Sequence, residues 1–458
     1  MVTGLVQFFY PDIKREELKK YGLLGLTFFF MVGAYWLLRL LKDLFFYKSV
    51  GFPVSLGWDE DAGRLALPYA KMISPWFVLI MVVIYTKLVD MFEKHKLFYI
   101  LSLFYIAAFS VIASILFVSS TYGEAYVGKE LLKNTGYAAY WITESLGSVF
   151  IAFFWSFTIS STMSEAAKRT FPFIIALGQI GSISGSSLLF LNASMWVKYC
   201  IAVMALVGVF FTIRHLIAVI PSEHMKSDKE DKKDKHGMFS GLKLLVTQPY
   251  FMGILVVSTF YEIAGSIVDY QMKSQAKMAG LDFEWFQGVL GTSVNVLTFV
   301  IALLGTSALM KRFGIRICLL IYPISFACML TGLYLYYSSG MATPTLLVWA
   351  AFSVMLIVKA VSYSVNNPIK DMMYIPTSKD AKFKVKSIID MLGGRSAKAG
   401  GASISSSLNV VGNPAASSHN LFFFGSLIGL GIIGVWITAA FYVGKKNQQL
   451  VKDGEILG

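Results

Sequence analysis

Two cations lie close together in the apolar stretch 21–45. Arg39 and Lys42 are three residues apart, so they share one face of any helix that forms here. A guanidinium binds phosphate oxygens as a bidentate fork and an ammonium binds them as a point charge, so the pair suits a chain of phosphate groups. Two alternatives stay open: the cations reach water at the helix end, or Arg39 pairs with Asp43.

Three carboxylates also lie in apolar stretches, where an ionisable group is costly and marks a pathway by default. Glu144 has small and polar neighbours in the run Thr-Glu-Ser-Leu-Gly-Ser, which indicates a stripe that faces a cavity. Glu262 and Asp269 are seven residues apart and so lie on one helical face, with Lys273 one turn further. Glu144 could instead form a structural pair with a cation of another helix, and Asp269 a simple pair with Lys273.

A third group of polar residues follows Lys359, which lies eleven residues before Lys370. Between them, Asn367 precedes Pro368, and a residue before proline disfavours the helical conformation. We therefore expect this helix to kink or break near Asn367, where freed backbone groups could bind substrate or ions. The alternative places Lys370 at the helix end in cytoplasmic water.

The elements that must position these residues are membrane-spanning helices. The 458-residue chain is 56% hydrophobic and only 15% charged, with a mean hydropathy of +0.63, whereas a soluble domain has about 25% charged residues. A span needs about 20 mostly apolar residues. On this basis we predict twelve spans, at about 21–45, 68–91, 97–120, 137–162, 170–193, 197–220, 249–272, 284–310, 317–338, 343–366, 388–411 and 420–443.

A charged segment divides these spans into two sets of six. Residues 226–235 contain almost only charged side chains and have no apolar face. We predict an N-terminal half at 1–220, a cytoplasmic linker at 221–242 and a C-terminal half at 243–458. Each half has a glycine-rich fifth helix, which favours close helix packing. The expected fold is all-α and major-facilitator-like, with a substrate site between the halves near mid-membrane.

The basic residues indicate the orientation of the chain. Net charge is +13, and the lysines and arginines cluster after even-numbered spans, which places both termini in the cytoplasm. The exceptions in the opposite loops are Lys48, Arg64, Lys129, Lys133, Lys198 and Lys277. The N-terminal residues do not resemble a cleavable signal peptide.

Several function classes are disfavoured because the sequence lacks the motifs that they require. No basic-aromatic patch favours nucleic acid, and the three cysteines lack the spacing of a metal site. No phosphate loop or hydrolase motif is present. We therefore expect no cofactor, no metal and no catalytic residue, and transport driven by gradients.

Three blocks of sequence resemble the non-mitochondrial ATP/ADP translocase family of bacteria and plastids. The first is Arg39-Leu-Leu-Lys42-Asp43, and the second runs from Thr143-Glu144-Ser through Glu-Ala-Ala-Lys-Arg to Pro172. The third, at 359–401, is the most specific, with Pro-Ile-Lys-Asp-Met-Met-Tyr-Ile-Pro and Gly-Gly-Arg-Ser-Ala-Lys-Ala-Gly-Gly. The general layout fits nearly the whole chain.

The resemblance assigns roles to particular residues. Lys42, Glu144 and Lys370 match residues implicated in transport, and Asp269 stands where the family has glutamate. The predicted phosphate-binding residues are Arg39, Lys42 and Lys370, the predicted gating carboxylates are Glu144 and Asp269, and the secondary candidates are Lys359, Asn367, Lys273 and Arg395. The chain departs from the family pattern at Leu40, Leu146, Ser362, Asn366 and Asn367, which bears on substrate and exchange mode.

These observations lead to one principal hypothesis. The resemblance implies an antiporter of the bacterial inner membrane that imports ATP against ADP, with phosphate as a further candidate substrate. The carboxylates would pair with the cations in the empty carrier, and a monomer in the lipid bilayer is expected. The alternatives are proton-coupled import, transport of GTP, CTP or NAD, a membrane receptor or scaffold that does not transport, and a membrane enzyme.

Overall fold

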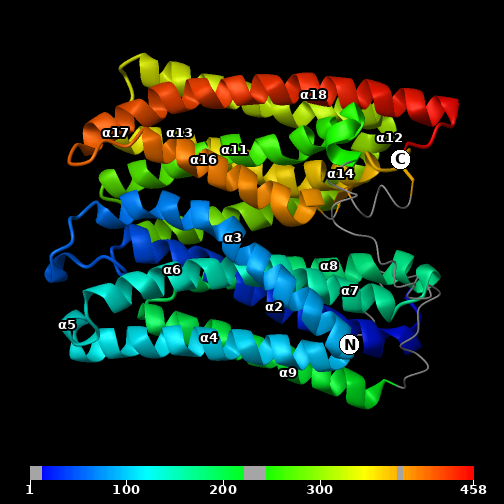
Figure 1. Ribbon diagram of the computed structural model, residues 1–458, viewed down its shortest axis with the longest axis horizontal. Coiled ribbons are helices and arrows are strands. Elements are labelled where there is room, and N and C mark those ends of the chain that lie inside the picture. Colours follow the sequence, from blue (N-terminus) through cyan, green and yellow to red (C-terminus); the bar gives the residue numbers. More distant parts are fainter. Residues whose placement is uncertain (1–12, 221–243, 379–384, 387, 458) are drawn as a thin grey trace. The chain divides into compact units, whose positions relative to one another are not determined.

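The computed structural model describes residues 13–220, 244–378, 385–386 and 388–457 (Figure 1). Within these ranges the regular structure is helical, apart from an isolated β-bridge between Thr377 and Leu457. The chain forms two compact units. Unit 1 comprises residues 1–60, 76–233 and 287–292, and unit 2 comprises 61–75, 234–286 and 293–458. The predicted linker at 221–242 lies outside the described residues.

The N-terminal helices run from residue 15 to residue 219. They are α2 (Arg15–Tyr47), η1 (Val54–Leu56), α3 (Ala62–Met91), α4 (Lys94–Tyr122), α5 (Glu124–Val127), α6 (Lys129–Ser145), η2 (Leu146–Phe150), α7 (Ile151–Ser160), α8 (Ser164–Ser187), η3 (Leu188–Phe190) and α9 (Met195–Val219). Helix α3 contributes to both units, because its residues up to 75 group with unit 2 and the rest with unit 1. It contains prolines at 68 and 75.

The C-terminal helices run from residue 249 to residue 453. They are α11 (Pro249–Met278), α12 (Phe283–Ser338), α13 (Pro344–Val361), η5 (Ser362–Asn366), α14 (Asn367–Met372), η6 (Ile389–Gly393), α16 (Gly394–Ser407), α17 (Pro414–Asn420), η7 (Leu421–Gly425) and α18 (Ser426–Asp453). Within the long α12, Gly314 has a φ of 71° and lies between the predicted spans 284–310 and 317–338.

Eleven helical segments among the described residues are long and apolar enough to cross a membrane. The remaining predicted span, at 388–411, corresponds to the short segments η6 and α16. Helix α16 has only 14 residues and is rich in glycine and serine, and this stretch carries Asp390, Arg395 and Lys398. Because its apolar content is low, this segment is not counted among the helices that could cross a membrane.

In unit 1 the central helix is α2, which packs against α6, α8 and α9. Glycines on α8 let its backbone approach that of α2. A Cβ on Gly185 would lie 2.1 Å from the Gly33 carbonyl oxygen, and one on Gly181 would lie 2.3 Å from the Phe29 carbonyl oxygen. The glycine-rich helix therefore has the packing role expected in lipid.

In unit 2 the central helix is α11, which packs against α13, α16 and α18 (Figure 1). A Cβ on Gly401 of α16 would lie 2.5 Å from the Ile263 carbonyl oxygen, whereas Gly394 and Gly400 have open space at that position. Only part of this second glycine cluster therefore serves close packing. Helices α11 and α18 are also joined by the Asn447 amide, which donates to the Tyr250 hydroxyl at 2.7 Å.

Short π-helical turns interrupt the helices near the candidate residues. Turn η2 begins two residues after Glu144, and η5 lies between Lys359 and Lys370. Of the kink or break predicted near Asn367, the break does not occur, because Asn367 has φ −63° and ψ −46° and the helix continues through α14. The irregularity is a widened turn before the proline, and such turns are frequent at functional sites.

Candidate functional site

Lys42 and Glu144 form a buried ion pair within unit 1. Lys42 lies on α2 and Glu144 on the last turn of α6, and the Lys42 ammonium donates to Glu144 Oε1. Both residues are less than 7% exposed. The ammonium also lies 3.7 Å from the ring centroid of Tyr140, which is one turn before Glu144 on the same face. The cation therefore has a carboxylate and an aromatic face as partners.

Arg39 lies one turn before Lys42 and packs on aromatic rings of its own helix. Its guanidinium carbon is 4.8 Å from the centroid of Trp36 and 6.0 Å from that of Tyr35. Tyr35 in turn lies against Gly147, where a Cβ would come within 2.6 Å of the tyrosine ring. Glycine is therefore required at 147 for α2 and the η2 turn to pack as they do.

Asp269 is the centre of a larger charge cluster within unit 2. Its Oδ1 lies 2.7 Å from the Lys359 ammonium, and its Oδ2 lies 2.9 Å from Lys273 and 3.7 Å from Lys71. Asp269 and Lys273 belong to α11, whereas Lys359 comes from α13 and Lys71 from α3. One buried carboxylate thus meets three ammonium groups from three helices.

Lys370 lies apart from Asp269, in a third group of charges. Its ammonium is 4.7 Å from the centroid of the Tyr261 ring. The Tyr261 hydroxyl donates to Glu262 Oε1 at 2.9 Å, and Glu262 lies 3.6 Å from the Lys398 ammonium. Glu262 and Asp269, which the spacing places on one face of α11, therefore serve two different cation groups.

The structure brings some of the predicted residues together and leaves others separate. Lys42 meets Glu144, and the secondary candidates Lys273 and Lys359 both meet Asp269. Asn367 is exposed at the start of α14, and Arg395 lies partly buried in the first turn of α16. The roles assigned to all of these residues stay predictions.

Two cations with little exposure were not among the candidate site residues predicted from the sequence. Lys71 lies inside the apolar stretch 68–91, so the rule that picked out Arg39 and Lys42 would have found it. The placement of Arg64 in a loop was wrong, because it lies in the first turn of α3 and is fully buried. Its guanidinium donates twice to Asp61 at 3.2 Å and once to Asn409 Oδ1 at 2.9 Å.

Four lysines assigned to loops also lie in helices, namely Lys129 and Lys133 in α6, Lys198 in α9 and Lys277 in α11. Lys198 is buried in the first turn of α9 and donates to the Leu189 carbonyl at 3.1 Å. Lys277 lies in the last turn of α11, 4.0 Å from Asp61. The positive charges of Lys198 and Lys277 are therefore used within the protein, which explains why these two depart from the loop-charge pattern.

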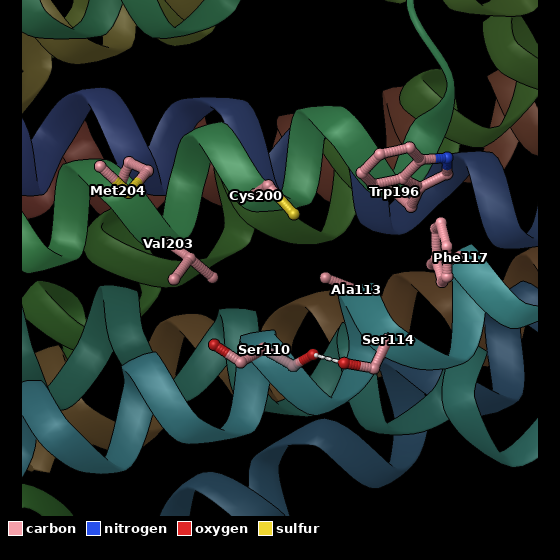
Figure 2. A pocket seen from close by; sticks show the side chains of 8 residues that line it. All are labelled: Ser110, Ala113, Ser114, Phe117, Trp196, Cys200, Val203 and Met204. Carbon is pink, nitrogen blue, oxygen red and sulfur yellow. Dashed lines mark hydrogen bonds between the residues drawn. The ribbon is translucent and has the colours of Figure 1, made fainter.

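A cavity of about 330 Å³ lies between α4 and α9 in unit 1 (Figure 2). Its lining includes Ser110, Phe117, Trp196 and Cys200 and has no charged side chain. It therefore offers no counter-charge for an anion. Within the described part of the chain, no three His, Cys, Asp or Glu side chains are grouped so as to hold a metal ion.

The sequence that contains these charge clusters matches a known protein family. Residues 1–447 match the family described as TLC ATP/ADP transporter. The chain belongs to this family. Because the match covers nearly the whole chain, it includes every residue of the three charge clusters, and it confirms the resemblance that the sequence blocks indicate.

Curated relatives of this TLC-family chain come from bacteria and from plants. It is 25% identical to ADP,ATP carrier protein 1 of Chlamydia pneumoniae, over 99% of this chain and 96% of the relative. It is 24% identical to ADP,ATP carrier protein 1 of Rickettsia bellii, over 99% and 98%. It is also 24% identical to the chloroplastic ADP,ATP carrier protein 2 of Arabidopsis thaliana, over 97% and 77%. These relatives are carriers, as predicted, rather than enzymes.

Solved structures of other transporters share the fold of this TLC-family chain. A bacterial homologue of the iron transporter ferroportin in an inward-facing state has a TM-score of 0.62 at 15% identity, over 94% of this chain and all of the other. The D-xylose-proton symporter has a TM-score of 0.61 at 11% identity, over 92% and 96%. The nucleoside transporter NupG has a TM-score of 0.59 at 12% identity, over 93% and 99%. The predicted all-α, major-facilitator-like membrane fold is thereby confirmed.

Proposed function

We propose that this protein exchanges ATP for ADP across a bacterial inner membrane. The observation that carries the proposal is the buried Lys42–Glu144 pair, which lies in two of the sequence blocks typical of the family. The bacterial relatives named as ADP,ATP carriers match over 96% and 98% of their length, which supports the same substrates here. A multi-pass carrier with the basic loops on one side has both termini in the cytoplasm.

The pair explains how binding is coupled to movement. In the empty protein Glu144 neutralises Lys42, so the cation is stable away from water. A phosphate of the nucleotide replaces Glu144 as the partner of Lys42, because phosphate carries more charge and more acceptor oxygens. Glu144 is then released, and the energetic difference between the two pairings favours the other conformation of the carrier. Binding of nucleotide on either side thereby drives exchange.

Two further cations contribute to phosphate binding, Arg39 in unit 1 and Lys370 in unit 2. Arg39 lies on the same helical face as Lys42 and is held by Trp36 and Tyr35, so its position is defined before substrate arrives. Lys370, held against Tyr261, contributes a further cation in unit 2. We propose that the carrier works as a monomer.

The proposal is tested by uptake of labelled ATP into proteoliposomes with and without ADP inside. Uptake that depends on internal ADP is the expected result. Replacing Lys42 by glutamine should weaken ATP affinity by about 10–100-fold, which corresponds to the roughly 1.5–3 kcal/mol of a hydrogen bond to a charged group. The control is Lys96→Gln, which removes a lysine whose side chain is 59% exposed. Unchanged ATP affinity in Lys42→Gln would contradict the assignment.

A second mode of transport is favoured by the departures from the family pattern. Ser362 stands where the family has lysine, and Asp269 stands where it has glutamate. The first change removes a positive charge and the second shortens the side chain that carries the carboxylate. If ATP enters vesicles that contain no nucleotide and follows a pH gradient, the carrier is a proton symporter. If ATP is taken up under neither condition, uptake of labelled GTP, CTP and NAD identifies the transported nucleotide.

A further inference from the structure

The cavity between α4 and α9 lies outside the three charge clusters (Figure 2). Its lining residues come from two helices, and they are Ser110, Ala113, Ser114 and Phe117 of α4 and Trp196, Cys200, Val203 and Met204 of α9. On each helix these positions are three or four residues apart, so one face of each helix borders the cavity. Because α4 and α9 pack against each other, the cavity is a groove that follows both helices.

The groove opens on an apolar surface. Both helices are long and apolar enough to cross a membrane. Phe117 and Met204 on the rim are 41% and 67% exposed, and Val111 and Phe211 on the same helices are exposed as well. In a membrane, apolar side chains exposed along a spanning helix meet hydrocarbon rather than water. The groove is therefore accessible to the acyl chains of lipids.

Aromatic residues place one end of the groove near the membrane–water interface. Trp196 lies in the first turn of α9, and Tyr122 ends α4 and is 67% exposed. Tryptophan and tyrosine are enriched at the level of the lipid head groups. From Phe117 to Ser110 the groove extends inward by about 10 Å along α4. The hydrocarbon of one leaflet is about 15 Å thick, so the groove lies at the depth of the acyl chains of that leaflet.

The chemistry of the lining suits an apolar ligand. None of the lining side chains is charged, and the Ser114 hydroxyl donates to the Ser110 carbonyl at 2.9 Å within its own helix. The Phe117 and Trp196 rings, whose centroids are 5.1 Å apart, form an aromatic wall at the end near the interface. The volume of about 330 Å³ lies at the lower end of the range for small-ligand pockets, about 300–1,000 Å³.

We propose that this groove binds one acyl chain of a membrane phospholipid. A flexible chain fits between two packed helices, whereas a helix of a second copy, about 10 Å across, does not. On the orientation proposed for the termini, the bound lipid belongs to the leaflet on the periplasmic side. The chain supplies the contacts that the lining would lack around an empty cavity, so it stabilises the packing of α4 against α9.

The experiment uses the full-length protein in nanodiscs of phosphatidylcholine, with a small share of that lipid carrying a diazirine in one acyl chain. Irradiation attaches the chain to the residues that it contacts, and mass spectrometry of the peptides measures the labelling at each site. Leu103 of α4 and Phe211 of α9 are the internal reference, because they are exposed two turns away from the groove on the same helix faces. We expect about 10-fold more labelling at the lining residues, which corresponds to the burial of about two methylene groups.

A variant with a filled groove tests the site directly. Ser114→Leu combined with Cys200→Leu occupies the groove with leucine side chains and should reduce labelling of the lining to the level of Leu103 and Phe211. The matched control is Val111→Leu, which adds bulk at an exposed position of α4 outside the lining and should leave the labelling unchanged. In detergent without lipid, the filled variant should melt at a higher temperature than wild type, because the leucines replace the missing chain. A cooperative melting transition also shows that the variant is folded.

Three results would overturn the inference. In wild type, equal labelling of the lining and of the reference residues means that the groove holds no chain, and this result does not depend on the folding of any variant. In a folded filled variant, labelling of the lining as strong as in wild type means that the chain lies elsewhere. An unlabelled groove in a protein that is dimeric in nanodiscs means that a second copy covers it. None of these results depends on which nucleotide the carrier exchanges.

Discussion

The Lys42–Glu144 pair makes a quantitative prediction about stability. Replacing Glu144 by glutamine removes the carboxylate and leaves the buried Lys42 ammonium facing an amide. Removal of one partner from a buried ion pair costs about 3–5 kcal/mol, because the remaining charge stays out of water. The ring of Tyr140, 3.7 Å from the ammonium, continues to stabilise the cation. We therefore expect a loss near the lower limit, about 3 kcal/mol.

The double variant Lys42→Met with Glu144→Gln tests whether this loss comes from a charge that has lost its Glu144 partner. Methionine has a length similar to that of lysine and no charge, so neither buried charge is left unpaired. Replacing both members of a buried pair by neutral groups is often close to neutral in stability. We expect the double variant to be within about 1 kcal/mol of wild type and more stable than Glu144→Gln alone.

The assay is thermal unfolding of the purified protein in detergent, with and without ATP. For a unit of roughly 200 residues, a change of 1 kcal/mol shifts the melting temperature by about 2–4 °C, so Glu144→Gln should melt lower by on the order of 6–12 °C. Saturating ATP should raise the melting temperature of wild type. It should not raise that of the double variant, which is folded but lacks the Lys42 contact.

Two outcomes would refute this reasoning. If the effects of the single changes at Lys42 and Glu144 add up in the double variant, the two groups are not energetically coupled in the protein. If ATP still stabilises the double variant as it does wild type, the nucleotide does not use this cation.

Three further predictions concern packing and buried contacts, and each is measured by melting temperature together with ATP exchange. Arg64→Lys keeps the charge but loses the bidentate fork, so stability should fall by about 1.5–3 kcal/mol. Gly185→Ala should destabilise strongly, because its Cβ would lie 2.1 Å from a backbone oxygen of α2, whereas Gly394→Ala has open space and should stabilise by about 0.5–1 kcal/mol. Gly147→Ala should cost about 1–3 kcal/mol through its clash with the Tyr35 ring, and adding Tyr35→Ala should recover part of that loss. Equal effects at positions 185 and 394, or no recovery at 147, would contradict the packing described.

The membrane character and most of the spans could be predicted because apolar length is a local property of the sequence. A run of about 20 apolar residues spans a bilayer whatever surrounds it, and eleven of the predicted spans correspond to long helices. The span at 388–411 was less predictable, since a helix that packs through glycine and serine needs little apolar surface of its own. The π-helical turn before Pro368 could not be predicted, because proline forbids one backbone arrangement without specifying which alternative replaces it.

The sequence by itself identified most of the charged residues of the candidate site, because a charge inside an apolar run is costly wherever the run folds. It also indicated the family, through blocks whose residues can be compared one by one. Only the tertiary structure decided which charges are partners. Lys42 and Glu144 are a hundred residues apart along the chain, and Asp269 meets Lys71 and Lys359 from helices far away in sequence. The packing of helices determines such contacts, and they cannot be predicted from a local pattern of residues.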